Sequence, residues 1–149
     1  MKRFLLLAML LSTFSLAGLA QNRPSLTVDD IFNGKLVPRR EMKRTTVQGD
    51  RLSALRLSEF RSVQFEAKDQ VLSRVSSVIS DVADGSSDKE TEMDGNLMTY
   101  AFITLDPSSE GLNRYLGYSL KTRGGKHFVT VIVFSGQASA EELKKKLIK

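Results

Sequence analysis

The apolar residues in the middle of the chain recur at helical spacing. Between residues 67 and 83 they fall three or four positions apart, which places them on one side of a helix. They are Val71, Leu72, Val75, Val78, Ile79 and Val82. Asp84 and Gly85 follow, and a glycine at this point is typical of a helix end. The pattern predicts a long amphipathic helix over residues 67–83.

Other parts of the chain have the patterns of strands. The segments are residues 60–66, 97–105, 114–121 and 128–134. In the first of them the apolar and polar residues alternate, so that Arg61, Val63 and Phe65 share one face. The last is rich in β-branched and aromatic residues, which favour strands. Gly124 and Gly125 precede it and predict a hairpin turn.

The order of these elements predicts an α+β domain. Residues 45–48 form a further possible strand, and the polar, acidic residues 85–96 are expected to form a loop or an edge hairpin. Ser139 and Glu142 have the spacing of a capping box, which predicts a short C-terminal helix over residues 139–148. We therefore expect an antiparallel sheet of about four to five strands, with the long helix and the C-terminal helix packed on one face.

The start of the chain has the layout of a secretory signal peptide. Lys2 and Arg3 precede an apolar run over residues 4–16, which is shorter than the roughly 20 residues that span a bilayer. Small residues then lead to an expected cleavage site between Ala20 and Gln21. The predicted organisation is a signal peptide (1–20), an N-terminal extension with a short helix and a basic stretch (21–44) and one α+β domain (45–149). The expected location is periplasmic or secreted.

The composition of the chain limits how the protein can be stabilised and which partners are expected. The chain contains no Cys, so we expect neither disulfides nor a lipid anchor after Ala20, and stability must come from an apolar core. The formal net charge of +5 falls by two when Lys2 and Arg3 are removed. No basic face with interleaved aromatics is evident, so nucleic acid is not an expected partner. No transmembrane anchor is expected after cleavage, and the oligomeric state stays open.

No catalytic constellation is evident. His127 is the only histidine, and a general base needs partners that the sequence does not place beside it. Acidic residues alternate within residues 84–94, but the glycine that a calcium-binding loop carries at its sixth position is missing. We therefore predict a non-enzymatic protein without catalytic residues, cofactor or metal, and leave calcium binding by residues 84–94 open.

The candidate binding residues are aromatic or basic. They are Tyr100, Tyr115, Tyr118, His127, Arg39, Arg40 and Lys43. Tyr115 and Tyr118 lie an odd number of positions apart, so they face opposite sides of their strand. One side is the core beneath the helices, and the other is either also packed in the core or an open face that can bind a ligand or a partner. The three basic residues belong to a stretch that is either a solvated connection or an anion-binding patch.

Residues 26–35, with the sequence LTVDDIFNGK, are followed by Pro38. This segment, and more loosely residues 26–50, resembles the N-terminal segment of secreted dipeptidyl-peptidase-IV-type peptidases. The whole chain is similar in layout to small exported Bacteroides-type proteins of unknown function. The resemblance implies an exported α+β protein without a known activity. We expect a binding or accessory protein of the cell envelope, whose partner is a protein or a small ligand. The alternative is a small hydrolase or peptidase-associated factor that uses His127 with distant Ser or Asp partners.

Overall fold

The computed structural model describes residues 26–147. The predicted signal peptide, residues 1–20, lies outside the described residues. Within them, no helix combines the length and the apolar character that a membrane crossing requires. The described chain begins with a short helix, α2 (Val28–Phe32), and ends with helix α4 (Ala140–Leu147).

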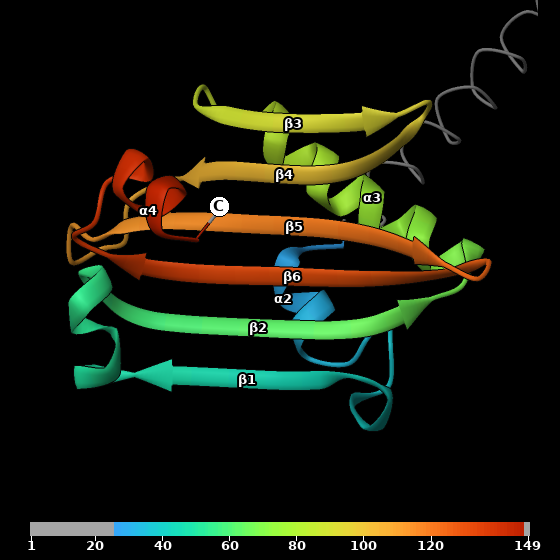
Figure 1. The fold of residues 1–149 in the computed structure, drawn as a ribbon, viewed down its shortest axis with the longest axis horizontal. Coiled ribbons are helices and arrows are strands. Elements are labelled where there is room, and N and C mark those ends of the chain that lie inside the picture. The colour runs from blue at the N-terminus through green and yellow to red at the C-terminus, as the bar shows by residue number, and fades with distance from the viewer. Residues whose placement is uncertain (1–25, 148–149) are drawn as a thin grey trace, which may run out of the picture.

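One antiparallel sheet of six strands organises the fold (Figure 1). The strands are β1 (Lys43–Gln48), β2 (Leu57–Ala67), β3 (Lys89–Asp94), β4 (Leu97–Leu105), β5 (Asn113–Arg123) and β6 (Lys126–Gly136). Their order across the sheet is β1-β2-β6-β5-β4-β3. The sheet therefore has more strands than the four to five expected. Two short 3₁₀ helices, η1 (Arg39–Glu41) and η2 (Gly49–Leu55), flank β1.

The additional strand is β3, which forms one edge of the sheet. All six of its residues are exposed, and its side chains are mostly charged. It pairs with β4 through the backbone, and the pair has a bulge between Glu92 and Met93. Exposed charged strands lack the apolar alternation that marks a strand in a sequence, although charge on an edge strand is common. At the other edge, β1 is also largely exposed and carries Lys43 and Arg44.

The main core lies between the sheet and the long helix α3 (Asp69–Asp84). The predicted helical stripe is buried here, with Val75 and Ile79 fully inaccessible. It packs on the face of the sheet that includes Val63, Ile103 and Val131. Helix α2 and the chain after it join this core through Ile31, Phe32, Val37 and Met42. The described part of the predicted N-terminal extension therefore packs into the same core as the rest of the domain.

The C-terminal helix α4 lies on the opposite face of the sheet from α3, in front of it in Figure 1. The expectation that both helices share one face is wrong. A second core, which we call the aromatic cluster, occupies this other face: Leu52, Leu57, Phe102, Tyr115, Phe134, Ala138 and Leu143. Leu143 of α4 is fully buried and packs on the aromatic rings, which shields them from water. The spacing of apolar residues in a short helix shows which side is buried but not against which face of a sheet.

The turn between β6 and α4 directs the chain onto this face. The backbone N–H groups of Gln137 and Ala138 both donate to the carbonyl of Arg56, at 3.0 and 3.1 Å. Gly136 lies so close to this point that a Cβ atom there would be 2.5 Å from the Arg56 oxygen and from the Leu57 Cα. Only glycine allows this approach, because any other residue would place its Cβ inside the van der Waals radius of the backbone.

Candidate functional site

Helix α4 covers only one end of its face of the sheet. The aromatic cluster lies beneath it, and the same face continues beyond it towards the β5–β6 hairpin (Figure 1). We call this uncovered part the open face. Cross-strand pairing places Gln64, Thr130, Ser119 and Tyr100 side by side across it. The open face therefore carries a row of hydroxyl and amide side chains, which we call the polar row.

An apolar hollow lies between α4 and the polar row. Gly117 of β5 forms its floor, because it has no side chain on this face. Phe102 and Ile132 are its cross-strand neighbours, and Tyr100 and Phe134 complete the walls. The volume of the hollow is about 120 Å³. A glycine inside a strand often marks a place where a ligand or another backbone comes close.

A wider groove of about 690 Å³ continues from the polar row to the hairpin end of the sheet. Phe128 lies in it with 41% of its surface exposed, flanked across the strands by Glu66 and Lys121. Arg123 adds a second positive charge at the hairpin. From Gly117 to Lys121 the strand rises by roughly 13 Å, at about 3.3 Å per residue. The open face thus runs from an apolar hollow to a basic end.

The three candidate tyrosines have different positions. Tyr115 and Tyr118 face opposite sides of β5, as predicted, but both are buried. The Tyr115 hydroxyl donates to the Ala138 carbonyl at 2.7 Å and so anchors the turn before α4. Tyr118 lies in the main core. Burial raises the pKa of all three tyrosine hydroxyls above the usual value. Tyr100 alone borders the hollow with a partly exposed side chain.

The other candidate residues lie away from the open face or at its margin. The Nδ1 atom of His127 is 2.9 Å from the Thr122 hydroxyl, across the β5–β6 hairpin. Arg39 donates from Nε to the Asn33 carbonyl at 3.2 Å, and Arg40 is exposed beside it. Lys43 pairs with Gln64 at the edge strand, on the outer margin of the polar row. The structure therefore does not bring the predicted binding residues together in one site.

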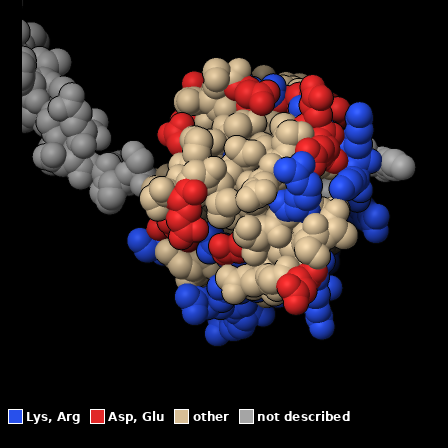
Figure 2. Space-filling model, turned by 90° about the vertical axis from the view of Figure 1, so that its left-hand side faces the viewer, with Lys and Arg blue, Asp and Glu red and all other residues tan. Residues whose placement is uncertain are grey.

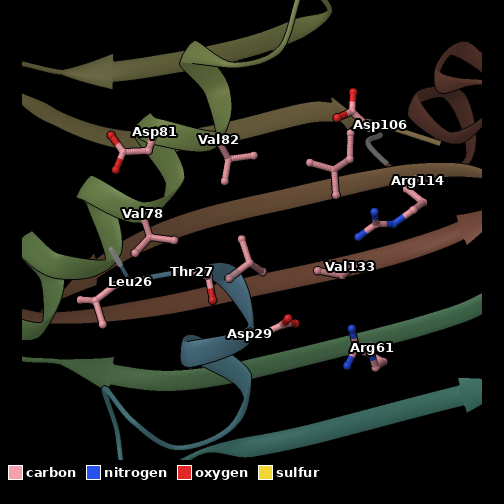
Figure 3. A pocket seen from close by; sticks show the side chains of 12 residues that line it. Leu26, Thr27, Asp29, Arg61, Val78, Asp81, Val82, Asp106, Arg114 and Val133 are labelled. Atoms are coloured by element: carbon pink, nitrogen blue, oxygen red, sulfur yellow. The ribbon is translucent and has the colours of Figure 1, made fainter. Parts of the chain in front are cut away.

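A second pocket, which we call the arginine pocket, opens on the α3 side of the sheet (Figure 3). Its volume is about 430 Å³. Arg61 of β2 and Arg114 of β5 lie on either side of Val133 of β6. Aliphatic residues, one threonine and three carboxylates complete the lining: Leu26, Val28, Val78, Val82, Leu105, Thr27, Asp29, Asp81 and Asp106. Figure 2 views this end of the sheet and shows charges of both signs on it.

Between residues 26 and 147, most charged side chains of the arginine pocket have no ion-pair partner. Arg61 forms an ion pair from Nε to Glu59 at 3.1 Å, and its guanidinium carbon lies 5.2 Å from the centre of the Phe32 ring. Within the described part of the chain, neither Arg114 nor the carboxylates of Asp29 and Asp81 form an ion pair. The pocket can therefore supply both positive and negative groups to a ligand.

Some of these residues could have been found from the sequence. Arg61 shares its strand face with Val63 and Phe65, and Arg114 likewise alternates in phase with buried Leu116. An arginine on the core-facing side of a strand indicates a candidate binding site, because an unpaired charge is costly to bury. Gly117, in the middle of a strand, is a second indication of a candidate site, because a glycine there leaves space on the face of the sheet. Pairing between strands is what brings Arg61 and Arg114 to the same pocket, and neither strand encodes that pairing alone.

The acidic segment after α3 has a structural role in the described chain. The Ser86 hydroxyl bonds to the carbonyls of Asp88 and Thr104, and the Asp88 carboxylate accepts from the Thr104 hydroxyl at 3.0 Å. Glu90 forms an ion pair with Lys144 of α4 at 2.8 Å. No group of three His, Asp or Glu side chains suited to a metal ion occurs between residues 26 and 147.

Comparison with known proteins gives one match. No curated protein and no solved structure matches the chain. A model of a family of unknown function, DUF6108, matches residues 13–147, which is most of the sequence. The match includes every strand of the sheet and therefore the open face and the arginine pocket. The chain belongs to the family of unknown function DUF6108.

Proposed function

We propose that this chain is an exported, non-enzymatic binding protein of the cell envelope, and that the open face binds an anionic amphiphile. The observation that carries the proposal is the hollow over Gly117, which leads into a groove with a basic end. An apolar group would fill the hollow against Phe102 and Ile132. An acidic group at the other end of the ligand would meet Lys121 and Arg123.

The chemistry of the open face supports binding. Ligand sites are mostly apolar with a few polar groups that fix orientation, and the hollow, with Ser119 and Thr130 at its border, has this composition. The exposed ring of Phe128 and the polar row together suit a molecule with an apolar body and polar substituents. The layout of residues 1–20 supports export to the periplasm or beyond, with cleavage near Ala20. The likeness of residues 26–50 to exported Bacteroides-type peptidases points to the same compartment.

The test uses the dye ANS, whose fluorescence rises in apolar sites. We expect saturable fluorescence with the purified chain, and displacement by octanoate but less by octanol, because only octanoate has a charge for Lys121. Replacing Gly117 with Leu should abolish displaceable binding by filling the hollow. A Cβ at Gly117 meets nothing closer than 3.8 Å, so the fold should tolerate the change. A matched control is Thr91→Leu on exposed strand β3, which should leave binding unchanged.

A second experiment tests the role of the positive charge of Lys121 in binding. Lys121→Gln should weaken octanoate binding by about fivefold, as expected for an exposed ion pair worth up to about 1 kcal/mol. Octanol binding should not change. Equal displacement by octanoate and octanol, or full binding by the Gly117→Leu variant, would overturn the proposal.

The hydrolase alternative expected a distant Ser or Asp beside His127, whereas the hydroxyl beside His127 in the described structure is that of Thr122, five positions away in the sequence. A hydroxyl beside an imidazole is the first half of a nucleophilic site, although a third group normally orients the base. Hydrolysis of p-nitrophenyl esters by the chain, abolished in both His127→Ala and Thr122→Val, would favour the hydrolase. Identical slow hydrolysis by the chain and both variants would exclude this pair as the active site.

A further inference from the structure

We propose that the hairpin end of the open face docks on an anionic lipid bilayer. The docking surface, which we call the basic surface, combines five exposed basic residues with one exposed aromatic ring. They are Lys43, Lys68, Lys121, Arg123, Lys126 and Phe128. Docking of this surface requires no ligand in the hollow, so it goes beyond the proposed function and can be tested apart from it.

Strand pairing places most of the basic surface on the open face. Lys121 of β5 pairs with Phe128 of β6, and Phe128 pairs on its other side with Glu66 of β2. Arg123 and Lys126 pair with each other two positions closer to the hairpin turn. Side chains two positions apart on a strand point to the same face. Three positive charges therefore surround the exposed ring of Phe128.

The two remaining basic residues lie next to this group. Lys43, on edge strand β1, pairs with Gln64 of β2, so both side chains belong to the open face. Lys68 follows Ala67, which pairs with His127 beside the hairpin turn. Neighbouring strands are about 4.8 Å apart, so the basic surface extends roughly 15 Å from β1 to β5. A bilayer presents many headgroups over this width and can contact all five charges at once.

Positive charge exceeds negative charge at the basic surface. Within residues 26–147, none of its five basic side chains forms an ion pair. Glu66 lies among them, whereas Asp69 begins α3 on the opposite face, and Glu92 and Asp94 lie on edge strand β3, which β4 separates from β5. The β5–β6 hairpin extends beyond the turn that joins β3 to β4 (Figure 1). A negative surface that approaches this end therefore meets the basic side chains before the acidic edge.

Phe128 favours a bilayer over a purely hydrophilic polyanion as the partner. Its ring is 41% exposed between the basic side chains. Binding at a membrane surface grows with the apolar area that is buried and with the attraction to anionic lipids. A bilayer supplies both, because the ring enters the boundary between headgroups and acyl chains while the basic side chains contact the phosphates. The groove that leads to the hollow is lined by Phe128 and Lys121, so docking also brings the groove to the bilayer.

Co-sedimentation of the purified chain with lipid vesicles tests the proposal. One set of vesicles contains phosphatidylcholine alone, and the other contains equal parts of phosphatidylcholine and anionic phosphatidylglycerol. We expect saturable binding to the anionic vesicles and binding at least about tenfold weaker to the neutral ones. Raising the salt concentration from about 0.05 M to about 0.5 M should weaken binding to the anionic vesicles by at least about tenfold, because salt screens exposed charges.

Two triple variants with the same net charge separate the basic surface from the charge of the whole chain. Combining Lys121→Gln, Arg123→Gln and Lys126→Gln should weaken binding by about 100-fold, because each basic residue near an anionic membrane contributes about fivefold. The matched control combines substitutions of exposed residues outside the basic surface: Arg51→Gln, Arg74→Gln and Lys145→Gln. The control should weaken binding by less than about threefold. An equal loss in both triple variants would overturn the proposal.

Two single variants test the role of the ring and the independence from the hollow. Phe128→Gln should weaken vesicle binding by about fivefold, because only the exposed part of the ring is newly buried on docking. Gly117→Leu, which fills the hollow, should leave vesicle binding unchanged even if it abolishes displacement of ANS. Unchanged binding by Phe128→Gln, loss of binding by Gly117→Leu, or equal binding to neutral and anionic vesicles would overturn docking through the basic surface.

Discussion

Replacing Leu143 with Ala tests whether α4 is held on the sheet by one buried side chain. Leu143 is fully buried in the aromatic cluster, and between Ala140 and Lys146 no other large side chain of α4 is buried there. Burial of a leucine contributes about 1.5–3 kcal/mol. The polar contacts between α4 and the rest of the described structure lie at the surface. They are the pairs Arg56–Glu142 and Lys144–Glu90, both at 2.8 Å, and the Lys146 ammonium, which donates to the Ala54 carbonyl at 3.1 Å. Such pairs contribute about 0–1 kcal/mol each.

These magnitudes set an upper limit on the free energy of unfolding that the Leu143→Ala variant can lose. A buried Leu→Ala change costs about 2–5 kcal/mol when the protein must keep the cavity. Helix α4 can instead detach, because it is short and lies near the end of the described chain, and the cost cannot exceed the free energy of its docking. We therefore expect a loss of about 2 kcal/mol in the free energy of unfolding, at the low end of that range. The m-value should also fall, because the native state then buries less surface.

Urea unfolding followed by circular dichroism, with hydrogen exchange of the α4 amides, measures both quantities. The matched control is Leu72→Ala in α3, which is 5% exposed in the main core. Helix α3 is continuous with strands at both ends and cannot detach, so this variant should lose about 2–5 kcal/mol with an unchanged m-value. The reasoning fails if Leu143→Ala costs as much as Leu72→Ala while the m-value and the protection of α4 stay normal.

Two further predictions concern Gly136 and the tyrosines. Gly136→Ala should destabilise the fold by about 1–3 kcal/mol, because its Cβ would meet the backbone of Arg56 and Leu57 at 2.5 Å; Gly117→Ala, with 3.8 Å of clearance, should leave urea stability unchanged or raise it by up to about 1 kcal/mol. All three tyrosines have raised pKa values, caused mainly by burial. Their stabilising contribution is therefore complete below the unfolded pKa of about 10 and is lost as the pH rises through the folded values. Ultraviolet titration should show tyrosinate forming at higher pH in the native chain than in urea, and coincident curves would contradict this.

The sequence predicted the parts of the fold whose side chains carry a strong periodic signal. The stripe of α3 and the apolar strands β4 and β6 have such a signal, and their burial confirms it. Strand β3 has none, because its charged side chains face solvent on both sides and only its backbone pairs with β4. The position of α4 depends on the turn at Gly136, which is a contact between residues distant in sequence.

The candidate sites were harder to predict for a related reason. Tyr115 and Tyr118 were correctly placed on opposite faces, yet burial of both depends on two different helices that cover the sheet. The hollow exists because Gly117 lacks a side chain while its cross-strand neighbours have large ones. Arg61 and Arg114 line the same pocket because a single strand, β6, separates β2 from β5. These features depend on which strands are neighbours in the sheet, and the sequence of one strand does not determine its neighbours.

The two edges of the sheet carry opposite charge, and this affects how copies of the chain meet. Every neighbouring pair of strands is antiparallel and their number is even, so β1 and β3 run in opposite directions. Two β1 edges repel through Lys43 and Arg44, and two β3 edges repel through Glu90, Glu92 and Asp94. Charge does not oppose a contact between the β1 edge of one copy and the β3 edge of another. Edge charge thus disfavours the pairing of two like edges. It does not disfavour head-to-tail stacking of β1 on β3, which the bulge in β3 opposes through the shape of that edge.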